Sequence, residues 1–400
     1  MAEERVTESV ESGATAVAAH GPTLAAAMRT TVLPRADGTA GVRRLVLEAK
    51  QRYQAVRPLG AGGQAEVTLE RDNDIDRTVA VKRLLPGRDD DASVLRFAEE
   101  VRTVGQLEHP NIVPIHDVGV DERGQYFFVM KYVEGETLEA VIARLAGGDP
   151  AYLDRYTPEY RLQICNEILR GVEHAHELGV LHRDLKPANV MVGSLGEVAI
   201  MDWGLAKRVG AAEHARSTSS TSERLFETHA GALLGTPGYM SPEQAAGKLD
   251  ELDARSDIYS LAVVFYEFLS LKHPRRHCRS VAELIAEVIE QPVSRIQTLT
   301  DFGKGRAPAT LAHFVRHGLD RDPALRYPNA KAMRERLEAV RDGRAPIECH
   351  VTFAQRVLDG AARWANRHPA ALLGGFVVGA LGLLGGAVAL AIEAVHLAGR

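Results

Sequence analysis

The chain has 400 residues, of which 45% are apolar and 25% charged, so it can bury a substantial core and has room for more than one domain. Its formal net charge of -5 gives no polybasic reason to expect nucleic acid as a partner. Three cysteines lie far apart without metal-ligand spacing, which fits a reducing compartment, and we expect them to be inert: Cys165, Cys278 and Cys349.

Residues 1–50 are rich in alanine, threonine, glycine and scattered charge without sustained periodicity. This composition predicts a disordered N-terminal extension. Glutamates crowd its start and no continuous apolar run follows them, so we expect no signal peptide and a cytosolic start.

Residues 53–132 contain four runs that are typical of strands, with one helical segment between them. These runs are 54–59, 66–71, 78–84 and 126–132. From about Thr157 onward the pattern becomes helical, as in Tyr160–Leu178. The region 53–341 is therefore expected to hold a small sheet part followed by a larger helical part.

A glycine-rich segment, Gly60–Val67, follows the first strand run. Such a loop brings backbone N–H groups close to phosphate oxygens, but by itself it is equally well explained as an ordinary turn. The next strand run ends in Lys82, within the apolar sequence Val79–Lys82. An ammonium group in that setting is costly without an anionic partner.

The helical segment Ser93–Leu107 offers this partner. Its apolar face carries Phe97 and Val104, and Glu100 lies at the edge of that face. A lone glutamate on a helix is usually a solvated surface residue. Here an inward Lys82 and an edge-facing Glu100 each explain the other.

The run His182–Asn189 places an acid, two cations and an amide within eight residues. This combination predicts a phosphoryl-transfer loop, provided that the other parts of such a site follow in order. The other motifs occur along the chain in the expected order, at residues 109–113, 128–133, 202–204, 235–240 and 241–243, and at Asp257 and Arg326.

With these motifs in this order, the chain resembles the eukaryotic-type serine/threonine protein kinases, in their bacterial membrane-bound branch. The resemblance covers about residues 53–341. It implies an α+β, bilobal fold, with a small antiparallel β-sheet N-lobe (53–132) that contains one helix and a larger, mostly α-helical C-lobe (133–341). It also implies ATP and Mg²⁺ as cofactors and proteins with serine or threonine hydroxyls as substrates.

The resemblance assigns roles to individual residues. Asp184 would accept or orient the proton of the substrate hydroxyl, Lys186 would neutralise the transferred phosphoryl group, and Thr236 would line the approach of the hydroxyl. Asn189 and Asp202 would hold magnesium, which favours carboxylate and amide oxygens. The implied ATP site consists of Leu59, Gly60, Ala61, Gly62, Gly63, Val67, Ala80, Lys82, Glu100, Met130, Lys131 and Val133.

Departures from the family pattern are mild: Ala65 in the glycine loop, Trp203 after the metal-binding aspartate, and Ser241 before Pro242-Glu243. No catalytic position is lost. The resemblance also implies that Glu243 and Arg326 form a buried ion pair. Asp257 would brace the backbone of the catalytic loop, although an acid at a helix start is most often an N-terminal cap.

The stretch from Asp202 to Glu243 is long and rich in hydroxyl groups. Such loops are usually just flexible, but Arg183 beside the catalytic aspartate offers a clamp for a phosphate. We therefore predict autophosphorylation, with Thr228 favoured and Ser220 and Thr221 as further candidates.

Residues Ala370–Ile392 form an uncharged apolar run, long enough to span a bilayer as a helix. Arginines precede it in the juxtamembrane segment 342–369, and few charges occur in the short tail 393–400. By the positive-inside rule we expect a single-pass protein of the inner membrane with its kinase domain in the cytoplasm. Gly375, Gly379, Gly382 and Gly386 share one helix face, which favours a homodimer, although glycine is also common in membrane helices.

Two other function classes stay open at this point. A pseudokinase scaffold would have the same fold without catalysis, but it would lack one of the catalytic residues, and none is lost. A small-molecule phosphotransferase would lack the segment from Gly235 to Glu243.

Overall fold

The computed structural model describes residues 31, 33, 35–37, 44–46, 51–88, 90–204, 206–208, 237–293, 308–344, 346 and 350–398. They fall into two compact units. The sheet unit comprises residues 1–101 and 115–132, and the helical unit comprises residues 102–114 and 133–400.

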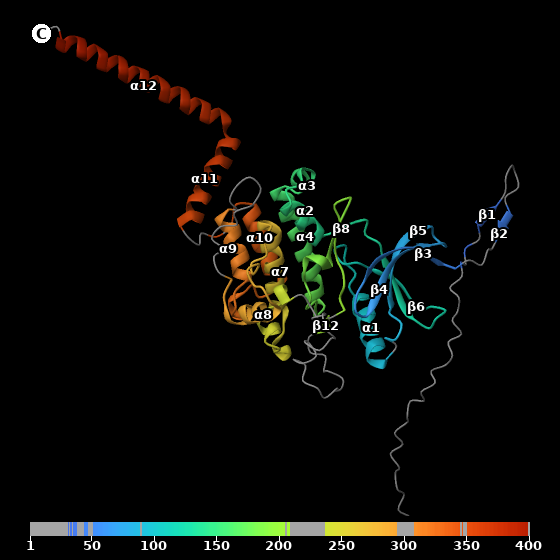
Figure 1. Ribbon diagram of the computed structural model, residues 1–400. Helices are drawn as coiled ribbons and strands as arrows, with labels where there is room; N and C mark the ends of the chain where they lie inside the picture. Colours follow the sequence, from blue (N-terminus) through green and yellow to red (C-terminus); the bar gives the residue numbers. More distant parts are fainter. Residues whose placement is uncertain are drawn as a thin grey trace, which may run out of the picture. The chain divides into compact units, whose positions relative to one another are not determined.

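The sheet unit is built on a five-stranded antiparallel sheet with the strand order β3-β4-β5-β7-β6 (Figure 1). The sequence predicted four of these strands and missed β6. None of the residues of this edge strand is fully buried, and polar residues and a glycine interrupt its apolar run. The strands are β3 (Tyr53–Ala61), β4 (Ala65–Asp72), β5 (Arg77–Leu84), β6 (Ile115–Val120) and β7 (Tyr126–Lys131).

Alternation along β5 and β7 divides the apolar side chains between two faces of the sheet. On one face Val79, Val81, Phe127 and Val129 pack with Tyr53. On the other face, Leu84 and Phe128 pack against Phe97 of α1 (Asp91–Val104). Lys82 belongs to the α1 face because it lies directly opposite Phe128 in the ladder.

Two short strands, β1 (Arg35–Asp37) and β2 (Arg44–Val46), pair antiparallel. They lie within residues 1–50, where we predicted no regular structure, and most of that segment lies outside the described residues.

The core of the helical unit is built around α7 (Ala254–Ser270), which is buried on nearly all sides. α4 (Pro158–Glu177), α9 (Ala309–Gly318) and α10 (Ala330–Arg341) contact it. This agrees with the prediction of a helical part. Together with the antiparallel sheet, it confirms the predicted sheet lobe and helical lobe.

The remaining elements of the helical unit are shorter or lie towards the C-terminus (Figure 1). Its strands are β8 (Gly135–Thr137), β9 (Val180–Leu181), β10 (Val190–Gly193), β11 (Val198–Ile200) and β12 (Lys207–Arg208). Its other helices are α2 (Leu138–Ala146), α3 (Pro150–Arg155), α6 (Pro242–Ala245), α8 (Val281–Glu290), α11 (His350–Arg367) and α12 (Pro369–Ala398). Its 3₁₀ turns are η1 (Pro187–Asn189), η2 (Pro237–Tyr239), η3 (Leu249–Glu251) and η4 (Pro323–Leu325).

The predicted membrane-spanning run 370–392 lies within α12, which is 30 residues long. Among the residues that the structure describes, no helix combines the length and apolar character needed to cross a bilayer.

Candidate functional site

In the sheet unit, the structure brings together the predicted pair of Lys82 and Glu100. The Lys82 Nζ lies 2.6 Å from Glu100 Oε1, and these side chains are only 16% and 8% exposed. The Lys82 ammonium also lies 5.7 Å from the centre of the Phe128 ring, within range of a cation–π contact. The Glu100 carboxylate and the Phe128 ring thus both contact this largely buried cation.

Several of the predicted ATP-site residues share this face of the sheet. Residues directly opposite in a ladder point to the same face, and Val67 pairs with Lys82 while Ala80 pairs with Met130. Ala80 and Lys82 are two residues apart in β5, so they also point the same way. The strands therefore place a small side chain and a cation side by side.

The glycine-rich segment forms the hairpin between β3 and β4. Gly60 and Ala61 lie in the ladder opposite Val67 and Glu66, and the Gly62 N–H donates to the Ala65 carbonyl oxygen at 2.8 Å. A Cβ built at Gly60 would meet no atom within 4 Å, so the fold of this hairpin does not require glycine there. Open backbone of this kind suits close approach of a ligand.

Three further predicted ATP-site residues lie near or just beyond the ends of β3 and β7. Leu59 is half exposed in β3, and Lys131 is exposed at the end of β7. Val133 is buried and belongs to the helical unit. The predicted set is therefore divided between the two units.

In the helical unit, the structure brings together the three described catalytic candidates of the run 182–189. Lys186 Nζ lies 2.7 Å from Asp184 Oδ2. The Asn189 side-chain amide donates to the Asp184 backbone carbonyl at 2.8 Å. A carboxylate, a cation and an amide thus form one compact cluster, in which the amide nitrogen of Asn189 is engaged and its oxygen is left to accept or to bind a cation.

Asp257 holds the backbone of this loop from one turn inside α7. Its Oδ2 accepts the N–H of His182 and its Oδ1 that of Arg183, both at 2.9 Å. His176 Nε2 lies 2.8 Å from Oδ2. Burial alone would raise the pKa of Asp257, but the His176 contact and these bonds hold that pKa below its usual value. The interpretation of Asp257 as a plain cap is wrong, because Asp253 caps α7.

Two non-glycine site residues, Arg183 in this loop and Asp202 after β11, have a positive φ. Arg183 has a φ of 68° and Asp202 a φ of 59°, both in the left-handed region that side chains other than glycine seldom adopt. Such conformations cost about 1–3 kcal/mol and persist only when the surroundings enforce them. At Arg183, Asp257 is one of the enforcing groups.

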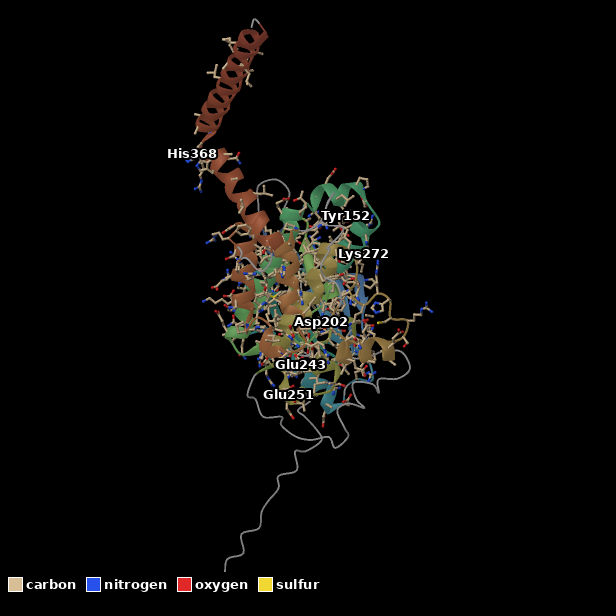
Figure 2. The ribbon with its side chains drawn as sticks, turned by 90° about the vertical axis from the view of Figure 1, so that its left-hand side faces the viewer. Tyr152, Asp202, Glu243, Glu251, Lys272 and His368 are labelled. Carbon is tan, nitrogen blue, oxygen red and sulfur yellow. The ribbon has the colours of Figure 1, made fainter. Side chains whose placement is uncertain are left out.

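The predicted metal ligand Asp202 is exposed (Figure 2), and it follows a strand end that is tied to Asn189. The Met201 N–H donates to the Asn189 carbonyl at 2.9 Å. Trp203, the departure from the family pattern, is buried, and its ring centre lies 4.5 Å from that of His182. The larger ring therefore packs directly on the loop 182–189.

Glu243 (Figure 2) and Arg326 form the predicted buried ion pair. The two guanidinium nitrogens lie 2.8 and 2.9 Å from the two carboxylate oxygens, and the Ser256 hydroxyl donates to the same carboxylate at 2.7 Å. Burial by itself would raise the pKa of Glu243, but Arg326 holds that pKa below its usual value. The pair fixes α6, the short helix that begins at Pro242.

Two residues that support the loop, Gln244 and His176, were not predicted from the sequence. The Gln244 side-chain amide donates to the Arg183 carbonyl at 2.8 Å and so connects α6 to the catalytic loop. A signal existed for α6 itself, because Ser241 and Gln244 form a capping box at its start. For His176 there was only its helical spacing, which equally suits a core residue.

Four predicted site residues lie outside the described residues: Thr236 and the phosphosite candidates Ser220, Thr221 and Thr228.

Comparison with known proteins adds an independent finding. The sequence pattern of the family described as protein kinase domain matches residues 53–337. A probable serine/threonine-protein kinase of Streptomyces coelicolor is 34% identical over 326 residues, which cover 80% of this chain and 44% of that protein. The serine/threonine-protein kinase PknB of Mycobacterium leprae is 35% identical over 299 residues, covering 74% and 44%.

A third relative, the serine/threonine-protein kinase PknD of Protochlamydia amoebophila, is 32% identical over 306 residues, which cover 74% of this chain and 30% of that protein. The chain thus spans less than half the length of these curated relatives.

Proposed function

This chain belongs to the protein kinase family, and from that premise we propose that it transfers the γ-phosphoryl group of ATP to serine and threonine hydroxyls of proteins. The observation that carries the proposal is the cluster of Asp184, Lys186 and Asn189. Phosphoryl transfer depends mainly on positioning and on neutralisation of charge, and in this cluster a cation and an amide side chain each lie within hydrogen-bond distance of the proposed base, Asp184.

In the proposed mechanism, Asp184 accepts or orients the proton of the substrate hydroxyl. The Lys186 Nζ lies 2.7 Å from the Asp184 carboxylate, so it can reach a phosphoryl group that is transferred next to that carboxylate. There the ammonium balances the negative charge of the phosphoryl group. Lys82, held by Glu100, binds the α and β phosphates. Thr236 lines the approach of the hydroxyl. Each residue acts by charge and position, without a covalent intermediate.

The residues suit magnesium. Asn189 offers an amide oxygen, because its nitrogen is occupied by the Asp184 carbonyl, and Asp202 offers an exposed carboxylate. Both are hard oxygen ligands, which Mg²⁺ prefers. When bound, the ion would neutralise the phosphate charge that develops during transfer.

The test is phosphoryl transfer by the purified chain from labelled ATP and magnesium to a serine-containing protein and to itself. Asp184→Asn should reduce the rate by about 10²–10⁴-fold, since that is the usual contribution of a positioned base. The exposed Asp154 on α3 provides the control, and Asp154→Asn should leave the rate unchanged.

The same experiment separates the alternatives. A pseudokinase scaffold would transfer no label in any variant, which would contradict the proposal. A small-molecule phosphotransferase would leave proteins unlabelled while consuming ATP in the presence of sugars or amines. The segment that carries Ser241–Glu243 favours protein substrates, because its family counterpart belongs to protein kinases.

We further propose control by autophosphorylation between Asp202 and Glu243, with Thr228 as the favoured site. Arg183 supports this, since its backbone is fixed by Asp257 and its guanidinium would pair with a phosphate. Phosphosite mapping of active protein should find Thr228, Ser220 or Thr221 modified. A wholly unmodified loop in an active preparation would contradict this control.

Finally, we propose that Ala370–Ile392 anchors the chain in the inner membrane with the kinase domain in the cytoplasm. The support is the uncharged apolar sequence and the arginines that precede it. Fractionation of cells should find the full chain in the membrane after alkaline washing, and a variant without 370–392 in the soluble fraction. Equal partition of both would contradict the anchor.

Pairing of the glycine face would bring two kinase domains together and favour trans-autophosphorylation. Chemical crosslinking of the membrane-bound chain should give a dimer that Gly379→Ile with Gly382→Ile reduces. A dimer signal that survives both substitutions would contradict this contact.

A further inference from the structure

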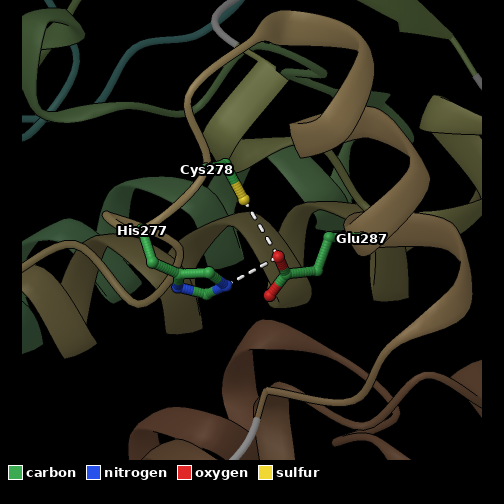
Figure 3. Close-up of side chains that lie close together, drawn as sticks. All are labelled: His277, Cys278 and Glu287. Atoms are coloured by element: carbon green, nitrogen blue, oxygen red, sulfur yellow. Dashed lines mark hydrogen bonds and ion pairs between the residues drawn. The ribbon is translucent and has the colours of Figure 1, made fainter.

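A cluster of three potential metal ligands lies in the helical unit (Figure 3). Its residues are distant in sequence from the proposed catalytic residues and lie on other elements. It consists of His277 and Cys278, in the connection after α7, and Glu287 on α8. The ligand atoms of the three side chains all lie within 4.8 Å of one another. Within the part of the chain that the structure describes, no other group of three histidine, cysteine or acidic side chains has its ligand atoms this close together.

The side chains converge on one atom. His277 Nε2 lies 2.7 Å from Glu287 Oε2, and the Cys278 thiol donates to the same oxygen at 2.9 Å. Two polar groups from one loop thus meet a single carboxylate oxygen on the neighbouring helix, as Figure 3 shows. A cation bound between these three side chains would stabilise this arrangement.

The donor set selects the kind of metal. One imidazole nitrogen, one sulfur and one carboxylate oxygen are the ligands of Zn²⁺ and its neighbours in the first transition row, whereas Mg²⁺ prefers oxygen alone. Three protein ligands leave the fourth tetrahedral position for water.

The distances permit binding after a small adjustment. Zinc bonds of about 2.0–2.3 Å in a tetrahedron separate ligand atoms by roughly 3.3–3.8 Å. The two observed contacts are shorter because hydrogen atoms bridge them, so each must open by about 0.5–1 Å. His277 is 60% exposed, which gives the imidazole room to move.

Once the thiol has lost its proton, Cys278 and Glu287 bring two negative charges to the cluster, and Arg276 and Arg279 flank the His277–Cys278 pair in sequence. Glu283, one helical turn before Glu287, adds a second acid near Cys278, while Arg275 opposes it. Arg275 is buried and bonded to the Tyr259 hydroxyl at 2.8 Å, so it is directed into the core.

Use of the thiol as a nucleophile is a poorer explanation of the cluster. A reactive cysteine needs a cationic neighbour that favours its thiolate. Here the hydrogen-bond partner of the Cys278 thiol is the Glu287 carboxylate, an anion, which disfavours the thiolate.

We propose that His277, Cys278 and Glu287 bind a zinc ion that ties the connection after α7 to α8. The consequence extends to the segment before α6. In the same connection, His273 Nε2 lies 3.3 Å from the Gly238 carbonyl of η2, and α8 itself contacts η2 and α6. A bound ion would therefore stiffen α8 and the surface next to Pro237–Tyr239. The expectation from the sequence that Cys278 is inert would then not hold.

The test uses the full chain after chelation and buffer exchange, without nucleotide. Zn²⁺ should raise its melting temperature, and Co²⁺ should produce the sulfur-to-cobalt absorption band with the intense visible bands of a four-coordinate site. Cys278→Ser should abolish the sulfur band, and Glu287→Gln should weaken zinc binding by roughly tenfold or more. The matched control is Glu290→Gln, an exposed glutamate on the same helix, which should bind as the parent does.

Each outcome decides the proposal. A band that persists in Cys278→Ser arises from Cys165 or Cys349 and overturns it. Equal weakening in Glu290→Gln and Glu287→Gln reveals non-specific binding by α8 and also overturns it. Because Glu287 is 20% exposed, Glu287→Gln should fold, and circular dichroism of the metal-free variants checks this. The result is independent of phosphoryl transfer, so it stands or falls separately from the kinase proposal.

Discussion

The two units hold their charged functional groups in different ways. In the sheet unit, Lys82 is held through its side chain: its ammonium contacts the Glu100 carboxylate on a helix and the Phe128 ring on a neighbouring strand. In the helical unit, the catalytic loop is fixed through its backbone, by Asp257 at two N–H groups and by Gln244 at a carbonyl. The sheet unit thus positions a side chain, whereas the helical unit positions a segment of chain.

This difference separates two kinds of cost. Lys82 acts through its side-chain charge, so its removal should reduce function more than it reduces stability. Removing a buried acid that accepts backbone N–H groups leaves those groups unsatisfied, so stability and function should fall together. Substitutions in the two units should therefore differ in how far they change stability relative to activity.

Lys82→Met should have the largest effect. Loss of the ammonium that we propose binds the phosphates should reduce phosphoryl transfer by about 10³-fold, equivalent to about 4 kcal/mol of transition-state stabilisation. The free energy of unfolding should fall by less than this, by about 1–2 kcal/mol, because the largely buried Glu100 carboxylate loses Lys82 as a partner. Initial rates and urea unfolding measure both, with Lys248→Met as a control at an exposed lysine. A loss of stability as large as the loss of activity would erase the contrast between the units.

Asp257→Asn should affect stability and activity together. An amide keeps one acceptor for the N–H groups of His182 and Arg183 but removes the charge that balances His176, so we expect about 3 kcal/mol of destabilisation. The pKa of Asp257 is lowered in the folded state, so its contribution is present above the unfolded pKa and is lost as pH falls towards the folded one. Chemical unfolding measured at pH 4 and at pH 2.5, on the two sides of the ordinary aspartate pKa, should therefore show a smaller loss of stability in the variant than in the parent.

The contrast between the units also explains what the sequence could predict. Lys82 and Glu100 were predictable because both patterns are local: an apolar strand run ends in Lys82, and a helical period places Glu100 at the edge of the apolar face that carries Phe97. Once the strand and the helix pack on each other, the pair follows.

The supports of the catalytic loop were harder to predict from residues alone. Asp257 and the N–H groups that it accepts are 74 and 75 residues apart, and no local pattern relates them. The chain offered an ordinary local alternative, a helix cap, and that role belongs to Asp253. Only the resemblance to kinases pointed to the brace. Gln244 had no such signal, since its partner is a backbone carbonyl 61 residues away.

The buried pair of Glu243 and Arg326 allows a sharper test of the helical unit. Each single variant, Glu243→Gln or Arg326→Met, should lower the free energy of unfolding by about 3 kcal/mol, because it leaves a buried charge unpaired. The double variant should be less destabilised than the sum, with a coupling of about 2 kcal/mol. Chemical unfolding of the four proteins gives this value. Strict additivity would mean that the ion pair contributes nothing beyond packing.

The smallest expected effect concerns His273, whose ring contacts Tyr239 and the Gly238 carbonyl beside α6. Burial lowers its pKa to about 4, so between pH 6.5 and 4 the unfolded chain binds a proton that the folded chain does not. Stability is therefore full above pH 6.5 and should fall by roughly 1–2 kcal/mol on acidification to pH 5. His273→Gln should lose this slope, measured by urea unfolding against the parent. The comparison cancels the other histidines with lowered pKa values, His109, His116 and His317, and an unchanged slope would show that the imidazole is already solvated.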